Sequence, residues 1–499
     1  MPAKRSLTLA LALLLVAAIP VRGASFPAIT VVDTIRPGVD GSYALWNSGR
    51  LGDYLYFGAD DGVNGYELWR TNGTSTTIVA DINLEFGSAS SPYGFTAFGD
   101  WLYFAAADGT HGSELWRTNG TTTTLVEDIN VTGGAGSSDP TDFTVLGDYL
   151  YFRANDGTHG SELWRTNGTT TVLVSDINIG NSGADSSDPD HFAALNGYLY
   201  FTANDGTHGA ELWRTNGTTT VLVSDINDGV AHSYPDGLTA FGNAVYFRAN
   251  DGTHGEELWR TNGTTTELVM DINTGNSGAD GSYPFYFTAF GGYLFFGANN
   301  GTNGQELWRT NGTTTELVMD INTGNSGADG SYPDYFTVFN GALYFQAIDS
   351  THGYELWRTN GTTTELVQDI NTGNSGADSS SPSNLTALGD FLYFNAADGT
   401  TAAKVWRING IGAAESAVIP GTNAGVGCMC DPLSAVDGRL FVTMWSDETG
   451  SEFAYLDEPT FVLPETNRSG SAWSMALVIL AAVTAVAGVG LRMRGAPRS

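Results

Sequence analysis

The stretch ANDGTHGSELWRTNGTT, residues 154–170, returns as residues 203–219 with one residue changed. Copies of it run along most of the chain at intervals of 46–49 residues. The tryptophan of each copy stands at Trp69, Trp116, Trp164, Trp213, Trp259, Trp308, Trp357 and Trp406. A fixed period of this length marks a solenoid, a propeller or an array, and it overrides a domain count drawn from the length of 499 residues.

Each repeat contains four short runs rich in aromatic and β-branched residues, separated by Gly, Asn and Asp. In one copy we expect strands at FTAF (287–290), YLFFGA (293–298), QELWRT (305–310) and TTELVMDI (314–321). Four antiparallel strands per repeat predict an all-β fold, a β-propeller of four-stranded blades. The run YLYF at residues 198–201 is apolar on both alternating faces, which indicates sheets covered on both sides, as stacked blades are. A solenoid is therefore less favoured than a propeller.

The two ends of the repeat region predict how the ring closes. Residues 433–457 align without gaps with residues 287–311 and supply three strands of a last blade. Residues 30–38, TVVDTIRPG, match the fourth-strand ending ELVMDINTG of residues 267–275. We predict a nine-bladed propeller over residues 24–457, closed by an amino-terminal strand at residues 30–35. A ring of eight with an irregular extra unit is the alternative, as is a last strand at TFVL, residues 460–463.

The terminal segments predict export and anchoring. Residues 1–23 have a basic start, an apolar run and small residues before a plausible cleavage site, as in a signal peptide. Residues 472–491 are uncharged and long enough for one transmembrane helix, and the basic tail of residues 492–499 would lie inside the cell. The linker of residues 458–471 contains LPETN, which resembles a sortase sorting signal with Asn467 in place of glycine, or an exosortase-type signal. We expect a single-pass protein on the outer face of the cell membrane or in the cell wall.

The charge of the chain limits its partners. It has 54 acidic and 21 basic residues, a net charge of −33. Six basic residues lie in the terminal segments, which leaves 15 against the 54 acidic residues, a net −39 for the middle of the chain. Such a surface repels nucleic acid and favours cations or cationic partners. Solubility in a salty exterior is the other interpretation.

The repeat motif also resembles a known family. ELWRTNGT with an upstream NDGTHG is similar to the ELWxxDGT repeats of exported prokaryotic proteins, over residues 30–457. This chain has Asn where that family usually has Asp, for example at Asn167 and Asn216. The resemblance implies an exported β-propeller and brings no catalytic residue with it.

The tetrad Glu-Leu-Trp-Arg is predicted to be structural. Strand alternation places Glu211 and Trp213 on one face of a blade and Arg214 on the other. We expect Trp213 to pack between blades. We also expect a repeated contact from arginine to carboxylate across the gap between blades, which would fix their spacing.

One face of the ring collects the turns between the second and third strands and the loops between blades. The turns carry histidine in five copies and asparagine in two, so a hydrogen bond within the turn is the favoured role of this position. The candidate binding residues of this face are Asp156, His159, Asp205, His208, Asp251 and His254. Oxygen ligands in the loops make weak calcium candidates of Asp271, Asn273, Asp280, Asp320, Asn322 and Asp329.

The sequence contains no Ser-His-Asp set, zinc-protease motif or nucleotide fingerprint, and near-identical loops are unsuited to asymmetric chemistry. We therefore predict no enzyme and no cofactor, with calcium the only ion considered. The predicted function is surface binding or adhesion through one multivalent loop face, with an extracellular glycan or protein as ligand. A passive surface-layer or spacer protein is the alternative, and an extracellular glycosidase or lyase is a more distant one.

Overall fold

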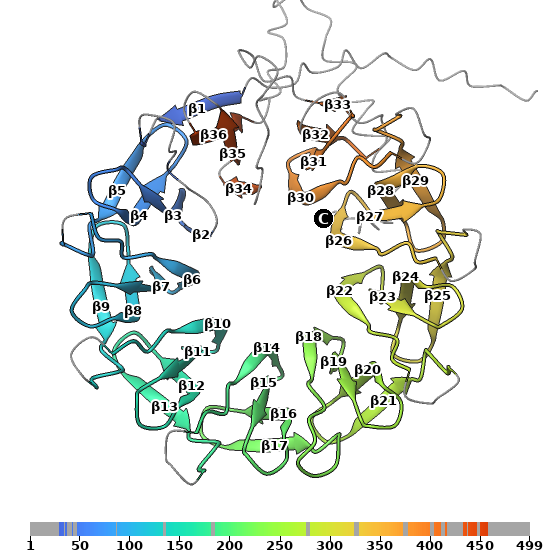
Figure 1. The fold of residues 1–499 in the computed structure, drawn as a ribbon, viewed down its shortest axis with the longest axis horizontal. Coiled ribbons are helices and arrows are strands. Elements are labelled where there is room, and N and C mark those ends of the chain that lie inside the picture. The colour runs from blue at the N-terminus through green and yellow to red at the C-terminus, as the bar shows by residue number, and fades with distance from the viewer. Residues whose placement is uncertain are drawn as a thin grey trace, which may run out of the picture. The chain divides into compact units, whose positions relative to one another are not determined.

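The computed structural model describes residues 29–33, 35–36, 42, 47–85, 87–132, 136–180, 185–275, 280–323, 329–372, 378–399, 404–410, 415–416, 433–436, 438–446 and 450–457. These residues form nine four-stranded antiparallel sheets, the blades, and contain no helix. Figure 1 shows the blades side by side around a ring, with one edge strand of each blade nearest the centre. The prediction of an all-β propeller with nine blades is confirmed, and the alternative of eight blades is wrong.

The first four blades follow one another along the chain. Blade 1 comprises β2 (Ser48–Leu51), β3 (Tyr54–Asp60), β4 (Tyr66–Thr71) and β5 (Thr76–Ala80). Blade 2 comprises β6 (Tyr93–Phe98), β7 (Trp101–Ala107), β8 (Ser113–Thr118) and β9 (Thr123–Glu127). Blade 3 comprises β10 (Thr141–Leu146), β11 (Tyr149–Asn155), β12 (Ser161–Thr166) and β13 (Thr171–Ser175). Blade 4 comprises β14 (Asp190–Leu195), β15 (Tyr198–Asn204), β16 (Ala210–Thr215) and β17 (Thr220–Ser224).

The remaining blades repeat the pattern until the last. Blade 5 comprises β18 (Asp236–Phe241), β19 (Ala244–Asn250), β20 (Glu256–Thr261) and β21 (Thr266–Met270). Blade 6 comprises β22 (Phe285–Phe290), β23 (Tyr293–Asn299), β24 (Gln305–Thr310) and β25 (Thr315–Met319). Blade 7 comprises β26 (Asp334–Phe339), β27 (Ala342–Asp349), β28 (Gly353–Thr359) and β29 (Thr364–Gln368). Blade 8 comprises β30 (Ser383–Leu388), β31 (Phe391–Ala396), β32 (Lys404–Ile408) and β33 (Glu415–Ser416).

Blade 9 is composite and closes the ring. Its sheet has the order β1 (Ile29–Asp33), β36 (Gly450–Asp457), β35 (Arg439–Ser446) and β34 (Ser434–Val436). Ile29 pairs with Leu456 in an antiparallel ladder, so the amino-terminal strand supplies the fourth strand that the carboxy-terminal repeat lacks. On the side facing blade 1, Phe441 packs in one cluster with Leu55 and Phe57. The predicted closure is confirmed, with the strand ending at Asp33.

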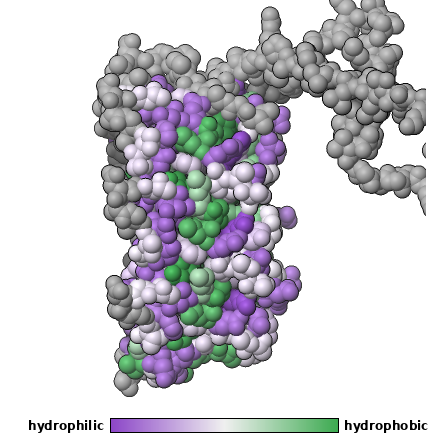
Figure 2. Space-filling view, turned by 90° about the vertical axis from the view of Figure 1, so that its right-hand side faces the viewer, coloured by the Kyte–Doolittle hydropathy of each residue, from purple (hydrophilic) through white to green (hydrophobic). Residues whose placement is uncertain are grey.

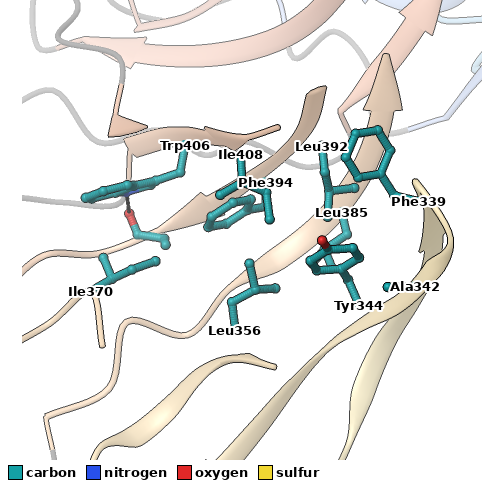
Figure 3. Close-up of a cluster of buried hydrophobic side chains, with 11 residues drawn as sticks. Phe339, Ala342, Tyr344, Leu356, Ile370, Leu385, Leu392, Phe394, Trp406 and Ile408 are labelled. Carbon is teal, nitrogen blue, oxygen red and sulfur yellow. Dashed lines mark hydrogen bonds between the residues drawn. The ribbon is translucent and has the colours of Figure 1, made fainter. Parts of the chain in front are cut away.

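Apolar side chains hold neighbouring blades together. In the cluster of Figure 3, Tyr344 and Leu356 of blade 7 pack against Leu392, Phe394 and Trp406 of blade 8. Leu356, Leu392 and Phe394 have no solvent exposure. Because full burial of one such side chain contributes about 1.5–3 kcal/mol, every blade depends on its neighbours for most of its core.

The strands of blade 6 show where the sequence prediction was accurate. The second and third strands match, because apolar residues on both faces of the run are buried. The first strand begins at Phe285, two residues earlier than predicted, with a bulge between Phe285 and Thr288. The fourth ends at Met319, because Ile321 turns into the core and its N–H leaves the ladder to donate to Glu306.

The outer strands form the rim of the ring. Figure 2 shows one side of this rim, where apolar patches recur between hydrophilic ones. Met270 and Met319, on two of these strands, are each 37% exposed. Glutamates on the same strands, such as Glu267 bound to Arg260, place charge along an edge that would otherwise invite pairing with another chain.

The predictions for the termini lie outside the described residues. These are the signal peptide (1–23), the linker with LPETN (458–471), the transmembrane helix (472–491) and the tail (492–499). Within the described ranges, the structure has no helix of the length and apolar character that a membrane crossing requires.

We expect removal of residues 24–36 to lower the melting temperature sharply. The deletion leaves β36 with one unpaired edge and opens the ring between blades 9 and 1. Circular dichroism during heating measures the change. A variant that lacks only residues 24–27, which precede β1, serves as the control. A melting curve unchanged by loss of β1 would contradict the composite blade.

Candidate functional site

A buried glutamate organises each of seven blades. Glu211 of β16 has no solvent exposure. Its carboxylate accepts hydrogen bonds from Ile226 N at 2.7 Å, Ser233 N at 2.8 Å and Ser233 Oγ at 2.6 Å. Ile226 and Ser233 begin and end the loop that crosses to blade 5, so one carboxylate fixes both ends of this loop. The equivalent glutamates are Glu67, Glu114, Glu162, Glu257, Glu306 and Glu355.

The repeated arginine makes a different contact from the one predicted. Arg117 Nη1 of blade 2 donates to the carbonyl oxygen of Gly168, in the turn between the last two strands of blade 3, at 2.7 Å. The equivalent bonds join Arg260 to Gly312, Arg309 to Gly361, Arg358 to Gly410 and, across the closure, Arg439 to Asn72. The predicted arginine-to-carboxylate contact between blades is therefore corrected. The arginine binds a backbone oxygen of the next blade, and the buried glutamate binds only its own loop.

The positions of Trp213 and Arg214 follow the predicted alternation. Trp213 packs against a cluster that includes Tyr151 and Leu163 of blade 3. Arg214 lies with its guanidinium over the ring of Tyr198, 4.5 Å from the centroid, and its Nη1 reaches toward Gly263 of blade 5. One residue thus contacts the preceding blade and the next residue contacts the following one.

Each histidine of the repeated turns bonds to an aspartate of its own turn. His159 Nδ1 lies 2.6 Å from Asp156 Oδ2, and Asp156 Oδ1 also accepts from the N–H groups of Thr158 and His159. The pairs Asp205–His208 and Asp251–His254 repeat this geometry at 2.7 Å. In the blades with asparagine instead of histidine, the side chain still bonds to the residue three places earlier, as Asn64 does to Asp61. The carboxylates of the predicted binding face are consequently occupied within their own turns.

Of the calcium candidates in the loops, Asn273 and Asn322 are buried at a blade junction, Asp271 and Asp320 are half-buried, and Asp280 and Asp329 are exposed. Asn273 Nδ2 donates to Gly281 O at 3.0 Å, and Asn273 Oδ1 lies against the backbone of Gly301 in blade 6. Asn322 makes the same bond to Gly330. Asp271 and Asp320 each have one buried oxygen without a hydrogen-bond partner. Within the described ranges, no three His, Cys, Asp or Glu residues gather as metal ligands, and calcium, including Asp280 and Asp329 as ligands, stays a prediction.

Two positions near the start of each of blades 2–8 have a left-handed backbone that glycine usually occupies. The first directly follows the serine bound by the buried glutamate and precedes a proline, as Tyr234 does with φ 46°. The second is the second residue of the innermost strand, inside its bulge. There the residues are Gly94, Asp142, His191, Gly237, Tyr286, Tyr335 and Asn384, all with φ between 54° and 71°. A bulky side chain in this conformation costs about 1–3 kcal/mol of folding stability. A large residue at such a position therefore indicates a functional role.

Tyrosines occupy these strained positions in three consecutive blades. We call the set the tyrosine arc: Tyr234 before β18, Tyr283 and Tyr286 around the start of β22, and Tyr332 and Tyr335 around the start of β26. Their exposed fractions run from 41% to 61%. Figure 1 shows the three strands as neighbours at the inner edge of the ring. The arc was not predicted from sequence, because the loops were treated as near copies. When the loops are aligned, tyrosine stands at these positions in blades 5–7 only.

A cavity of about 560 Å³ lies beside the arc, between blades 4 and 5. We call it the acidic cavity, since Asp188, Asp190, Asp236 and Glu256 line it together with Arg248. Arg248 Nη2 binds Asp236, and its Nε lies 3.2 Å from Glu256.

Two histidines complete the acidic cavity. His191 Nδ1 is 3.3 Å from Asp236 Oδ1. The ring of His232 stacks on Tyr234 with centroids 4.7 Å apart and planes 9° from parallel, which gives the cavity a flat aromatic wall. Neither histidine belongs to the repeated turns, so this cavity is specific to one place in the ring.

Known proteins show only a weak likeness to this chain. No protein-family model matches the sequence, and no curated protein matches it. The resemblance to ELWxxDGT repeats therefore stays a prediction. Among solved structures, a chain from a study of two prolyl endopeptidases and their inter-domain dynamics is similar at 11% identity and a TM-score of 0.40, over 71% of this chain and 54% of its own.

Two further solved structures are puromycin-hydrolysing enzymes. A peptidase from Mycobacterium tuberculosis shows 8% identity and a TM-score of 0.37, over 76% of this chain and 62% of its own. A puromycin hydrolase variant shows 14% identity and a TM-score of 0.35, over 71% of this chain and 58% of its own. This chain spans a little over half the length of these enzymes. Identities and TM-scores this low transfer no activity.

The prediction of an adhesion propeller that binds through one multivalent loop face is wrong. The carboxylates assigned to that face, Asp156, Asp205 and Asp251, are held by their own turns. The side chains that differ between blades lie instead at the inner edge of the ring, in one sector.

We expect the melting temperature to rise as the pH falls from 8 to 5. Burial raises the pKa of Glu162, Glu211 and Glu306 to about 7, above the ordinary 4.5. Their contribution to stability is then complete below pH 4.5 and is lost as the pH rises through 7, where a buried charge forms. The aspartate bound to His159 raises that histidine's pKa above 6.5, which acts in the same direction.

Differential scanning calorimetry at several pH values measures this dependence. Glu211→Gln removes one titrating group of the same shape, so the pH slope should become shallower. Glu127→Gln, at an exposed site on β9, is the matched control and should leave the slope unchanged. A melting temperature that falls steadily between pH 8 and pH 5 would contradict the assignment.

Proposed function

We propose that this propeller is a non-enzymatic binding protein whose acidic cavity takes one organic cation, a guanidinium or primary ammonium group. The observation that carries the proposal is the cavity itself, built from residues that break the repeat. Its volume of about 560 Å³ falls in the range of small-ligand sites. A single asymmetric site replaces the symmetric, multivalent face predicted from sequence.

The charges of the lining favour a cation. Four carboxylates and one guanidinium, those of Asp188, Asp190, Asp236, Glu256 and Arg248, give an excess of three negative charges when the histidines are neutral. Arg248 holds Asp236 and Glu256 in place, while Asp190 Oδ1 is held by the N–H of His191 at 2.7 Å. Three of the four carboxylates are thus fixed before a ligand arrives, which reduces the entropy lost on binding.

The aromatic wall supports the same ligand class. His232 Nδ1 accepts a hydrogen bond from the N–H of Ala210 at 2.8 Å, which fixes the ring against Tyr234. A planar guanidinium can stack on such a face and donate in its plane to carboxylates. The cavity offers both groups within one lining.

The hydroxyl groups of the cavity argue against nucleophilic catalysis. Ser187 Oγ donates to the buried Glu162 at 2.5 Å, and Thr202 Oγ1 donates to the carbonyl oxygen of Pro235. Neither hydroxyl is bonded to His191 or His232, as activation by a base would require. Binding is the function that these described side chains support.

The terminal segments support a location for this binding. We propose that residues 1–23 direct export and residues 472–491 anchor the chain, so that the ring faces the exterior. Its cation would then come from the surroundings of the cell or from its surface.

We expect agmatine, a guanidinium compound without a carboxylate, to bind the purified full chain, and succinate not to bind. Asp236→Asn should weaken agmatine binding about tenfold, because a charged hydrogen-bonded contact contributes about 1.5–3 kcal/mol. Isothermal titration calorimetry measures both. Asp142→Asn, which changes a carboxylate at the inner edge of blade 3, is the matched control and should bind normally. Equal affinity for agmatine and succinate would contradict the proposal.

We expect protease added to intact cells to remove the ring while the cells stay whole. The chain is acidic and should be released as a soluble fragment, detected by an antibody against the repeats. Mass spectrometry of the released protein shows whether LPETN is cut after Thr466 or the tail is retained. Protection of the ring until the cells are broken would contradict outward display.

A further inference from the structure

We infer that the ligand is an extended basic polypeptide, which places one cationic side chain in the acidic cavity and lies along the tyrosine arc across blades 5–7. The inference rests on the proposed function and extends it from a single cationic group to a polymer. Three observations carry it: the strained backbone of the arc, its continuity with the cavity, and the charge around it.

The backbone shows that the arc is not a by-product of folding. At the second residue of the innermost strand, blades 2 and 5 have Gly94 and Gly237, which adopt the left-handed conformation without strain. Blades 6 and 7 have Tyr286 and Tyr335 in the same conformation, 54% and 41% exposed. Packing does not demand rings that stand in solvent, so a partner that covers them accounts for their presence.

The arc and the cavity form one continuous surface. A second cavity, of about 380 Å³, shares His191 and Asp236 with the acidic cavity and is lined on its far side by Phe285 and Tyr286. The ring of Phe285 meets Tyr286 edge-on, with centroids 4.8 Å apart, and occupies the space beside Gly297, which has no side chain there. Asp334 of blade 7 accepts a hydrogen bond from Tyr286. The arc is therefore oriented by its neighbours and leads away from the cavity.

The charge favours a basic polypeptide over a neutral glycan. Tyrosine rings can stack on sugars as well as on cations. Here, however, the arc adjoins Asp188, Asp190 and Asp334 in a chain with a net charge of −33. Elsewhere the ring already places arginine on tyrosine, with Arg165 lying 4.1 Å from the centroid of Tyr149. Lysine or arginine side chains of a partner would find the same arrangement repeated along the arc.

Peptides of increasing length separate the arc from the cavity. The purified full chain is titrated with agmatine and with arginine-glycine peptides of two, four and eight residues, at low and physiological salt. We expect at least a tenfold gain in affinity from two to eight residues, reduced by salt. The double variant Tyr286→Gly and Tyr335→Gly should lose most of this gain and bind agmatine normally.

Glycine at these positions makes the variant a sharp test. It restores the residue found at the equivalent places in blades 2 and 5, so the melting temperature should stay the same or rise. Loss of binding without loss of stability then reports the exposed rings alone. Tyr149→Phe, at a ring already covered by Arg165, is a matched tyrosine control and should keep the full gain.

The remaining outcomes decide against the inference in distinguishable ways. If affinity still rises with peptide length in the glycine variant, the role of the arc is overturned and the cavity proposal is unaffected. A neutral hexasaccharide that binds in a tyrosine-dependent way, while the peptides do not, would replace the polypeptide with a glycan. Peptide binding that needs the tyrosines without any agmatine binding would support the arc and overturn the cavity.

Discussion

A buried carboxylate without a cationic partner is the contact on which this ring depends. In seven blades it accepts two backbone N–H groups and one serine hydroxyl, and it thereby closes the loop that crosses to the next blade. The bound serine directly precedes the first left-handed residue, as Ser233 precedes Tyr234. The same carboxylate thus supports the fold and positions the side chains that vary. A fixed frame with variable residues at its loop ends is a general way to build a binding surface.

Contacts between blades use other groups, and the polar ones join one blade to the next in the same direction. Arginine reaches forward to a glycine carbonyl oxygen, as Arg117 does to Gly168, and asparagine reaches forward to a turn glycine, as Asn273 does to Gly301. Together with the apolar clusters between blades, these contacts give a frame that can tolerate strained residues in a few loops. The strain of the tyrosine arc is confined to positions that none of these contacts uses.

Much of the frame was predictable from sequence, and the binding sector was not. The strands follow from apolar residues at period two, and closure follows from a match between residues 30–38 and the end of a repeat. The role of Glu211 could not be predicted, because its partners stand in a loop whose path is not local. Tyr286 could not be predicted either, since a left-handed backbone is expected at glycine. The one signal in the sequence was that glycine, Gly94 or Gly237, occupies the equivalent position in two other blades.

The paired strands β1 and β36 also set the order of events during synthesis. Ile29 lies in the first strand of the ring to be made and its partner Leu456 lies in the last. At about 5–20 residues per second, a ribosome needs on the order of 20–85 s to make the residues between them. During that time blade 1 has no neighbour on one side. The apolar face that blade 9 later covers is therefore exposed to solvent unless another molecule shields it. Closure is therefore a step that follows translation, and the interval before it is when neighbouring chains can exchange strands.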